Sequence, residues 1–163
     1  MTLTTHAITG AALATLFPNN PVLGFIIGFS SHYVLDAIPH STYSVASIRK
    51  DEKNSLNSEM IISKDSYKDL IKIGIDGMLG LILSFLLFGI FRQHSFFVIF
   101  MGAFGGMLPD ALQFCYWRWK HEPLTTFQKL HNWAHTKMRL DDKPILGAVT
   151  QILFVCLVVF IFK

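Results

Sequence analysis

Histidine and aspartate residues are the side chains of this sequence whose types and spacing could do chemistry. His32, Asp36 and His40 lie in the run S-S-H-Y-V-L-D-A-I-P-H, and His131 and His135 lie in L-H-N-W-A-H. The first run lies in an apolar stretch of the chain. Because ionisable groups are costly to place in a membrane, a set of them with ligand-type side chains predicts a functional site.

The spacing of these residues suits metal binding. Residues four apart share one face of a helix, so each of the two runs can present a pair of ligands to one ion. Imidazole and carboxylate together favour Zn²⁺, with Mn²⁺ or Fe as alternatives, whereas carboxylates alone favour Mg²⁺ or Ca²⁺. The metal ligands that we predict are His6, His32, Asp36, Asp110, His131 and His135.

Two further residues are expected to have catalytic or supporting roles. Asp76 interrupts a long hydrophobic stretch, and His40 follows Pro39, which should end a helix and let His40 turn back toward the site. Either residue would be a ligand, a partner that orients a ligand, or the general acid or base. Six ligands exceed the needs of one catalytic metal, so a cluster of two ions is an expectation, with water activated for attack on a phosphoryl or carbonyl centre.

Each of these residues, taken singly, also has a structural explanation. One H-x-x-x-H pair on an amphipathic helix is weak support for a metal site. Asp110 could cap a half-helix after the preceding Leu-Pro, and Asp76 could pair with Lys72. His94 and His121 lie in loops away from the set, and we interpret them as solvent-facing.

The composition favours an integral membrane protein of one domain, residues 1–163. Of the 163 residues 52% are hydrophobic and 15% are charged, whereas about a quarter of the residues of a soluble domain are charged. The net charge of +3 does not indicate a nucleic-acid binder. Cys115 and Cys156 have no C-x-x-C spacing, which argues against a disulfide framework or a thiolate zinc site. No basic cluster precedes the first apolar run, which predicts no cleaved signal peptide.

Apolar stretches predict an all-α bundle of about five membrane-embedded helices. Leu70 to Phe91, Phe96 to Trp117 and Pro144 to Phe162 are each near the ~20 residues that cross a bilayer. His6 to Leu16 and Pro21 to Ile38 predict a helical hairpin that enters the membrane and returns, with a turn at Pro-Asn-Asn-Pro. The first arm is short, so a full crossing by both arms is left open.

Two polar segments separate these stretches. Residues 41–68 are expected to form a polar loop without a core of its own. Residues 120–143 place Phe127, Leu130 and Ala134 at helical spacing. This pattern predicts a short amphipathic helix on the membrane surface that carries the H-x-x-x-H pair.

Glycines four apart occur in two of the apolar stretches, Gly24 with Gly28 and Gly102 with Gly106. Such spacing lets membrane helices approach closely, although glycine is also common in spanning helices without a packing role.

Basic residues concentrate in and beside the two polar segments, whereas the connection at 92–95 holds only Arg92. The positive-inside rule therefore predicts that both segments, and the N-terminus, are cytoplasmic. The basic residues counted are Arg49, Lys50, Lys53, Lys64 and Lys68, followed by Arg118, Lys120, Lys129, Lys137, Arg139 and Lys143.

This topology places the candidate ligands at one depth. They come from separate parts of the chain, yet each falls near the cytoplasmic end of its segment. Histidines with independent structural roles would have no reason to share a level. We therefore expect them to meet at the cytoplasmic edge of the bundle.

The motifs together resemble those of small membrane-bound metal-dependent hydrolases, which include the LexA-binding inner-membrane family. That family is remotely similar to zinc-dependent phospholipase C, and the resemblance implies a helical, multi-histidine phosphoesterase site in the bacterial inner membrane. The chain departs from the family in the order of its motifs, in Ala111-Leu112 after L-P-D, and in Asn132-Trp133 between the paired histidines. The matching pieces are T-x-H-x-x-x-G at His6 and Gly10, G-x-x-S-H-x-x-L-D from Gly28 to Asp36, L-P-D at Asp110, and H-x-x-x-H at His131 and His135.

The first functional hypothesis is a metal-dependent hydrolase that acts at the cytoplasmic interface on a phosphoester, including a phospholipid. A transporter of a divalent metal or of protons is an alternative, although a pathway should spread its ligands through the depth of the bilayer. A non-enzymatic metal- or haem-binding membrane protein is a third alternative. Paired histidines suit haem, but three aspartates do not.

Overall fold

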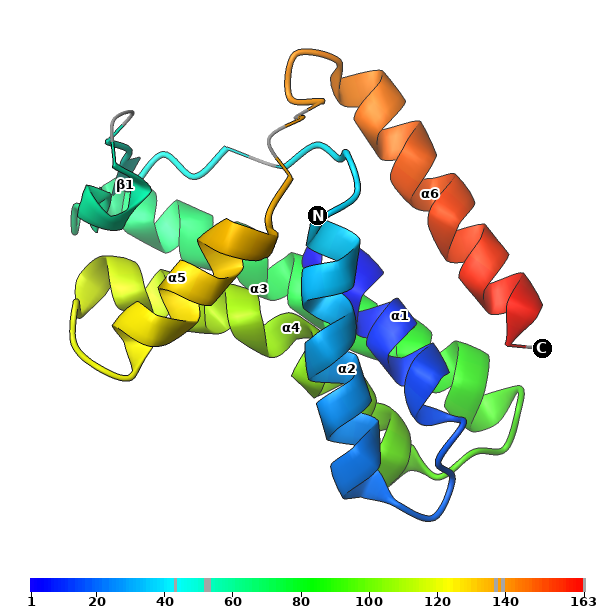
Figure 1. Ribbon diagram of the computed structural model, residues 1–163. Coiled ribbons are helices and arrows are strands. Elements are labelled where there is room, and N and C mark those ends of the chain that lie inside the picture. The colour runs from blue at the N-terminus through cyan, green and yellow to red at the C-terminus, as the bar shows by residue number, and fades with distance from the viewer. Residues whose placement is uncertain (43, 52–53, 137, 139, 163) are drawn as a thin grey trace.

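The chain folds into a mostly helical structure, as the apolar stretches predict. The computed structural model describes residues 1–42, 44–51, 54–136, 138 and 140–162, and 70% of it is helix. Three of the basic residues counted above, Lys53, Lys137 and Arg139, lie outside the described residues. In chain order the elements are α1 (Leu3–Ala14), α2 (Pro21–Asp36), β1 (Ile48–Arg49), the 3₁₀ turn η1 (Ser55–Asn57), β2 (Glu59–Met60), α3 (Lys64–Ser84), the π-helical turn η2 (Phe85–Ile90), α4 (Phe96–Arg118), α5 (Leu124–Ala134) and α6 (Pro144–Ile161) (Figure 1).

Three helices are long and apolar enough to cross a membrane, fewer than the five membrane-embedded helices predicted. They are α3 continued by η2 (27 residues), α4 (23 residues) and α6 (18 residues). The first two helices are shorter, with 12 residues in α1 and 16 in α2. The Thr15 hydroxyl donates a hydrogen bond to the Ala12 carbonyl at the end of α1, and the Asn20 side chain caps α2 by accepting a hydrogen bond from the Leu23 amide. These two caps keep the hairpin short.

The short helix α1 lies among α2, α3 and α4, and α6 runs along its outer side (Figure 1). Its side chains are small where it meets its neighbours, and Ala7, Ala11 and Ala12 are completely buried. Ile8 of α1 and Ile99 of α4 belong to the same apolar core. The first helix is therefore an interior element.

Glycines let the backbones of α1, α2 and α4 cross closely. A side chain added at Gly10 or at Gly28 would overlap the Gly102 carbonyl oxygen, and one added at Gly106 would overlap the His6 carbonyl oxygen. The close approach predicted for Gly28, Gly102 and Gly106 is thus present. Because the helices meet here, the ends of α1, α2 and α4 that carry the candidate ligands are brought side by side.

The polar loop has more structure than predicted. Strands β1 and β2 form an antiparallel hairpin in which Ile48 pairs with Met60. The buried carboxylate of Asp69 accepts a hydrogen bond from the Ser47 amide at 2.7 Å. Residues 64–68 form the first turn of α3, because Ser63 and Ser66 make a capping box there.

Three side chains from α4 and the segment after it hold the turn η1. The Tyr116 hydroxyl donates to the Leu56 carbonyl at 2.9 Å, and Lys120 Nζ donates to the Asn57 carbonyl at 2.8 Å. Asn132 Nδ2 of α5 donates to Ser55 Oγ at 3.0 Å. The two polar segments are therefore in direct contact.

The glycine crossing gives a test of the packing. We expect Gly102→Ala to lower the free energy of unfolding by about 1–3 kcal/mol, the usual cost of overpacking, because the new methyl group would meet the Gly10 backbone and Ala14. Gly74→Ala in α3 is the control, since its added carbon has no neighbour within 4 Å. Thermal unfolding in detergent should show a lower midpoint for Gly102→Ala only, and equal midpoints for the two variants would contradict the close crossing.

Candidate metal centre

The carboxylate of Asp36 is the point at which the candidate ligands meet. Asp36 is the last residue of α2, and its side chain is only 2% exposed. Its two oxygens face different neighbours. Oδ2 lies near the imidazoles of His32 and His131, whereas Oδ1 lies near those of His6 and His40.

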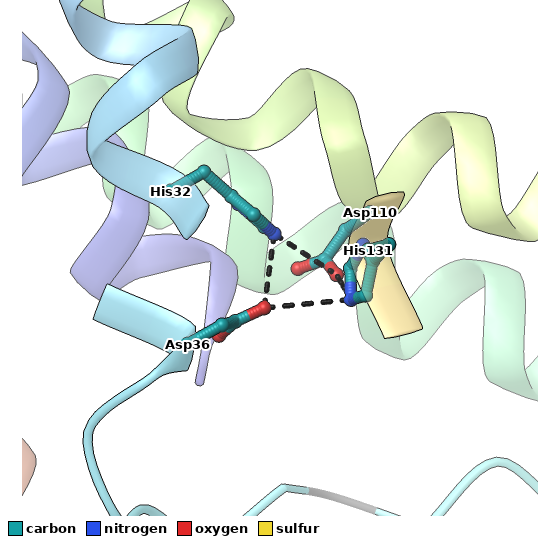
Figure 2. Close-up of side chains that lie close together, drawn as sticks. All are labelled: His32, Asp36, Asp110 and His131. Atoms are coloured by element: carbon teal, nitrogen blue, oxygen red, sulfur yellow. Dashed lines mark ion pairs between the residues drawn. The ribbon is translucent and has the colours of Figure 1, made fainter. Parts of the chain in front are cut away.

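The first group of ligand atoms comes from three helices. Figure 2 shows His32 and Asp36 of α2, Asp110 of α4 and His131 of α5 directed toward one another. His32 Nε2 is 3.1 Å and His131 Nε2 is 3.4 Å from Asp36 Oδ2. The same two nitrogens are 3.8 and 3.9 Å from Asp110 Oδ1.

A second group shares Asp36 with the first. One ligand atom each from Asp36, His40 and His135 lies within 4.8 Å of the others. His40 Nε2 is 3.6 Å from Asp36 Oδ1, so this histidine turns back toward the site, as predicted from Pro39. His135 is not part of the α5 helix, because α5 ends at Ala134 and His135 has extended backbone angles. The prediction that both paired histidines lie on one helix is therefore wrong for His135.

His6 belongs to neither group but lies next to His32 and Asp36. Its ring is stacked on that of His32 with 3.9 Å between centroids, and its Nε2 is 3.3 Å from Asp36 Oδ1. The Met1 backbone nitrogen is 3.1 Å from the same oxygen. Oδ1 of Asp36 thus has three nitrogen neighbours, from Met1, His6 and His40, whereas Oδ2 has two, from His32 and His131.

The separations between donor atoms fit a bound ion. A tetrahedral zinc ion with ligands at 2.0–2.1 Å keeps those ligands about 3.3 Å from one another. The nitrogen-to-oxygen distances around Asp36 Oδ2, 3.1 and 3.4 Å, are close to that value, and those to Asp110 Oδ1, 3.8 and 3.9 Å, are longer by about half an ångström. The residues present therefore suit a divalent metal ion.

Backbone carbonyls orient three of the imidazoles. Nδ1 of His32, of His40 and of His135 lies 2.8, 2.7 and 3.1 Å from the carbonyl oxygens of Gly106, Ile38 and Thr136, respectively. A carbonyl oxygen can only accept, so each Nδ1 carries the proton and donates it. In the neutral ring each Nε2 then has a free lone pair, which is the usual arrangement of metal-binding histidines.

Several of these nitrogens are buried without a hydrogen-bond partner among the described residues. They include Nε2 of His6, of His32 and of His40. Burial also lowers the pKa of His131 to about 4 and that of His40 to about 4. Both rings are therefore neutral at pH 7, the form that binds a metal. An unpaired polar atom in the interior is costly, and a bound ion would satisfy these lone pairs.

Asp76 lies apart from the cluster, at the start of α1. Its carboxylate accepts hydrogen bonds from the Leu3 amide at 2.6 Å, from the Thr4 amide at 3.3 Å and from the Thr4 hydroxyl at 2.6 Å. An anion at a helix N-terminus is stabilised by the unpaired amides there. Asp76 thus binds the N-terminus of α1 less than one turn before His6. Its role is to position this helix and the histidine on it.

A cavity of about 1070 Å³ opens beside the cluster. Asp36, Asp110, His131 and His135 line it, and the side chain of Asp110 is 27% exposed. His6, by contrast, is completely buried. The centre therefore has one buried side and one side that opens to the cavity.

Sequence reasoning missed the groups that support the ligands. Backbone carbonyls at Ile38, Gly106 and Thr136 carry no signal in a sequence. Gln128 and Asn132 line the cavity. Gln128 precedes His131 by three residues, and Asn132 follows it directly. Because both lie on the same predicted helix as His131, their positions in the sequence could have identified them.

Comparison with known protein families, curated sequences and solved structures finds no match to this chain. The assignment of a function to the centre therefore depends on its geometry.

Shared ligation by Asp36 makes a prediction about metal content. We expect Asp36→Asn to remove most of the metal, whereas His131→Ala and His135→Ala should each remove a smaller part, because each of the two histidines belongs to one group only. Elemental analysis of the detergent-purified protein measures this.

His121→Ala is the matched control, because His121 is exposed and lies outside both groups. Its metal content should equal that of the unmodified protein. Metal content unchanged by Asp36→Asn would rule out the shared centre.

Proposed function

We propose that this protein is a membrane-embedded, metal-dependent hydrolase that acts on a phosphoester, including a phospholipid, at the membrane surface. The observation that carries the proposal is the convergence of imidazole Nε2 atoms and carboxylate oxygens on Asp36, beside an open cavity. Three apolar helices of crossing length support a location in a membrane.

The ligand set favours Zn²⁺, with Mn²⁺ or Fe as alternatives, because imidazoles outnumber carboxylates. Two ions would share Asp36, one on each of its oxygens, and the ion on Oδ1 would displace the Met1 ammonium that donates to it. His32, Asp110 and His131 would hold the first, and His40 and His135, with His6 close by, would hold the second. A bound divalent metal supplies a Lewis acid and makes water a nucleophile near neutral pH.

The residues of the chain divide the remaining tasks. His6, His32 and His40 form the buried back of the centre and keep bulk water from that side. Asp110, His131 and His135 face the cavity, where a phosphoester can approach. We assign His40 to the ligands, since its Nδ1 proton is engaged by Ile38, and Asp76 to the positioning of α1.

We place the centre at the cytoplasmic face of a bacterial inner membrane. The support is the contact between the two polar segments. Tyr116, Lys120 and Asn132 bind the turn η1, so both basic segments lie on one side of the molecule. The positive-inside rule assigns that side to the cytoplasm.

The alternative functions differ in how the ligands should be arranged. A transporter of metal ions or protons would need ionisable groups spaced along a path through the bilayer. Here they surround one carboxylate. A haem site would leave Asp36 and Asp110 between the histidines without a role.

Hydrolysis gives the direct test. We expect the zinc-loaded protein in detergent to hydrolyse one or more of a panel of soluble phosphomonoesters, phosphodiesters and phospholipids, and to lose this activity on chelation. His131→Ala should reduce kcat/KM by more than the roughly 10–100-fold that loss of an outer-shell partner costs.

His121→Ala again serves as the control and should retain full activity. A protein that holds its metal but hydrolyses nothing in the panel would instead favour transport or a structural metal.

A further inference from the structure

We propose that the wall of the cavity formed by α3 and α4 is a subsite for the hydrocarbon chain of a membrane lipid whose phosphoester lies at the cluster. This inference deepens the proposed function and rests on it. It concerns side chains that do not bind the metal.

The wall is apolar and is built from two helices. Leu70 and Ile73 of α3 are three residues apart, and Phe104, Met107 and Leu108 of α4 follow helical spacing. Leu70 is 55% and Phe104 is 41% exposed. These side chains therefore leave an apolar surface uncovered inside the cavity.

Polar side chains line another part of the cavity. Lys50, Ser55 and Ser58 of the loop line it, as do Gln128 and Asn132 of α5. A ligand that fills the cavity must therefore be amphipathic, with a polar part near α5 and the loop and an apolar part against α3 and α4. A free phosphate ester without a chain would leave the apolar wall uncovered.

The position of the wall along α4 agrees with a lipid chain. Asp110 lies three residues after the middle of α4 and Phe104 lies three residues before it, so Phe104 is six residues, or about 9 Å, further from the Arg118 end of the helix. Both α3 and α4 are of crossing length. The cavity thus extends from the cluster toward the depth at which hydrocarbon chains lie, and a lipid already in the bilayer can enter it.

Ile73→Trp tests the subsite by filling the apolar wall. Its matched control is Ile75→Trp, since Ile75 is 64% exposed, lies two residues further on the same helix and does not line the cavity. Leu70→Trp is a second blocking variant at an exposed position that should tolerate the larger side chain. Metal content and gel-filtration profiles establish that each variant is folded.

The binding measurement uses phosphatidylglycerol with a photoactivatable diazirine in one acyl chain, in detergent micelles. Crosslinks in the original protein and in Ile75→Trp should map to Leu70–Ile73 and Phe104–Leu108 and be competed by unlabelled lipid. Ile73→Trp and Leu70→Trp should reduce them several-fold. Crosslinks spread equally over α6, or unchanged in both blocking variants, would overturn the subsite.

Hydrolysis separates this inference from the proposed function. Ile73→Trp should reduce cleavage of the phospholipid about tenfold and leave cleavage of a soluble phosphodiester unchanged. Equal loss on both substrates would overturn the subsite while leaving a hydrolase. If no substrate is cleaved, the proposed function fails, and the crosslinking result still decides whether a chain binds here.

Discussion

The buried carboxylate of Asp36 is the interaction on which the arrangement of the helices depends. A carboxylate taken out of water is costly unless it is paired, and here imidazoles from α1, α2, α5 and the loop after α2 surround it. A bound cation would satisfy both their lone pairs and its charge. Because the ligands come from different helices and loops, metal binding would also hold these elements together. The free energy of metal binding would then become part of the free energy of folding.

Helix packing makes this convergence sterically feasible. Gly28, Gly102 and Gly106 lack the side chains that would keep α1, α2 and α4 apart. The same close approach gives the Gly106 carbonyl its place next to His32 Nδ1. One packing feature thus both positions the helix ends and fixes the ring orientation of a ligand.

Much of the fold and of the cluster could be predicted from the sequence, because the informative residues differ chemically from their surroundings. Asp36 and Asp110 stand out in apolar stretches, and the basic residues indicate which segments share a side. Helix ends were less predictable, since His135 leaves α5 by one residue and the polar loop gains its structure from contacts with α4 and α5. Asp76 could not be separated from the ligands by type or depth, because only the tertiary fold brings the start of α1 to it.

The unequal lengths of the helices have a consequence for the surrounding bilayer. The 16 residues of α2 span about 24 Å and the 23 residues of α4 about 35 Å, whereas the hydrocarbon core is about 30 Å thick. Val22, Ile26 and Val34 are exposed along α2, so a bilayer in contact with this helix would have to become thinner to match it. Hydrophobic mismatch would then thin one leaflet locally and favour residence of the protein in thin membranes.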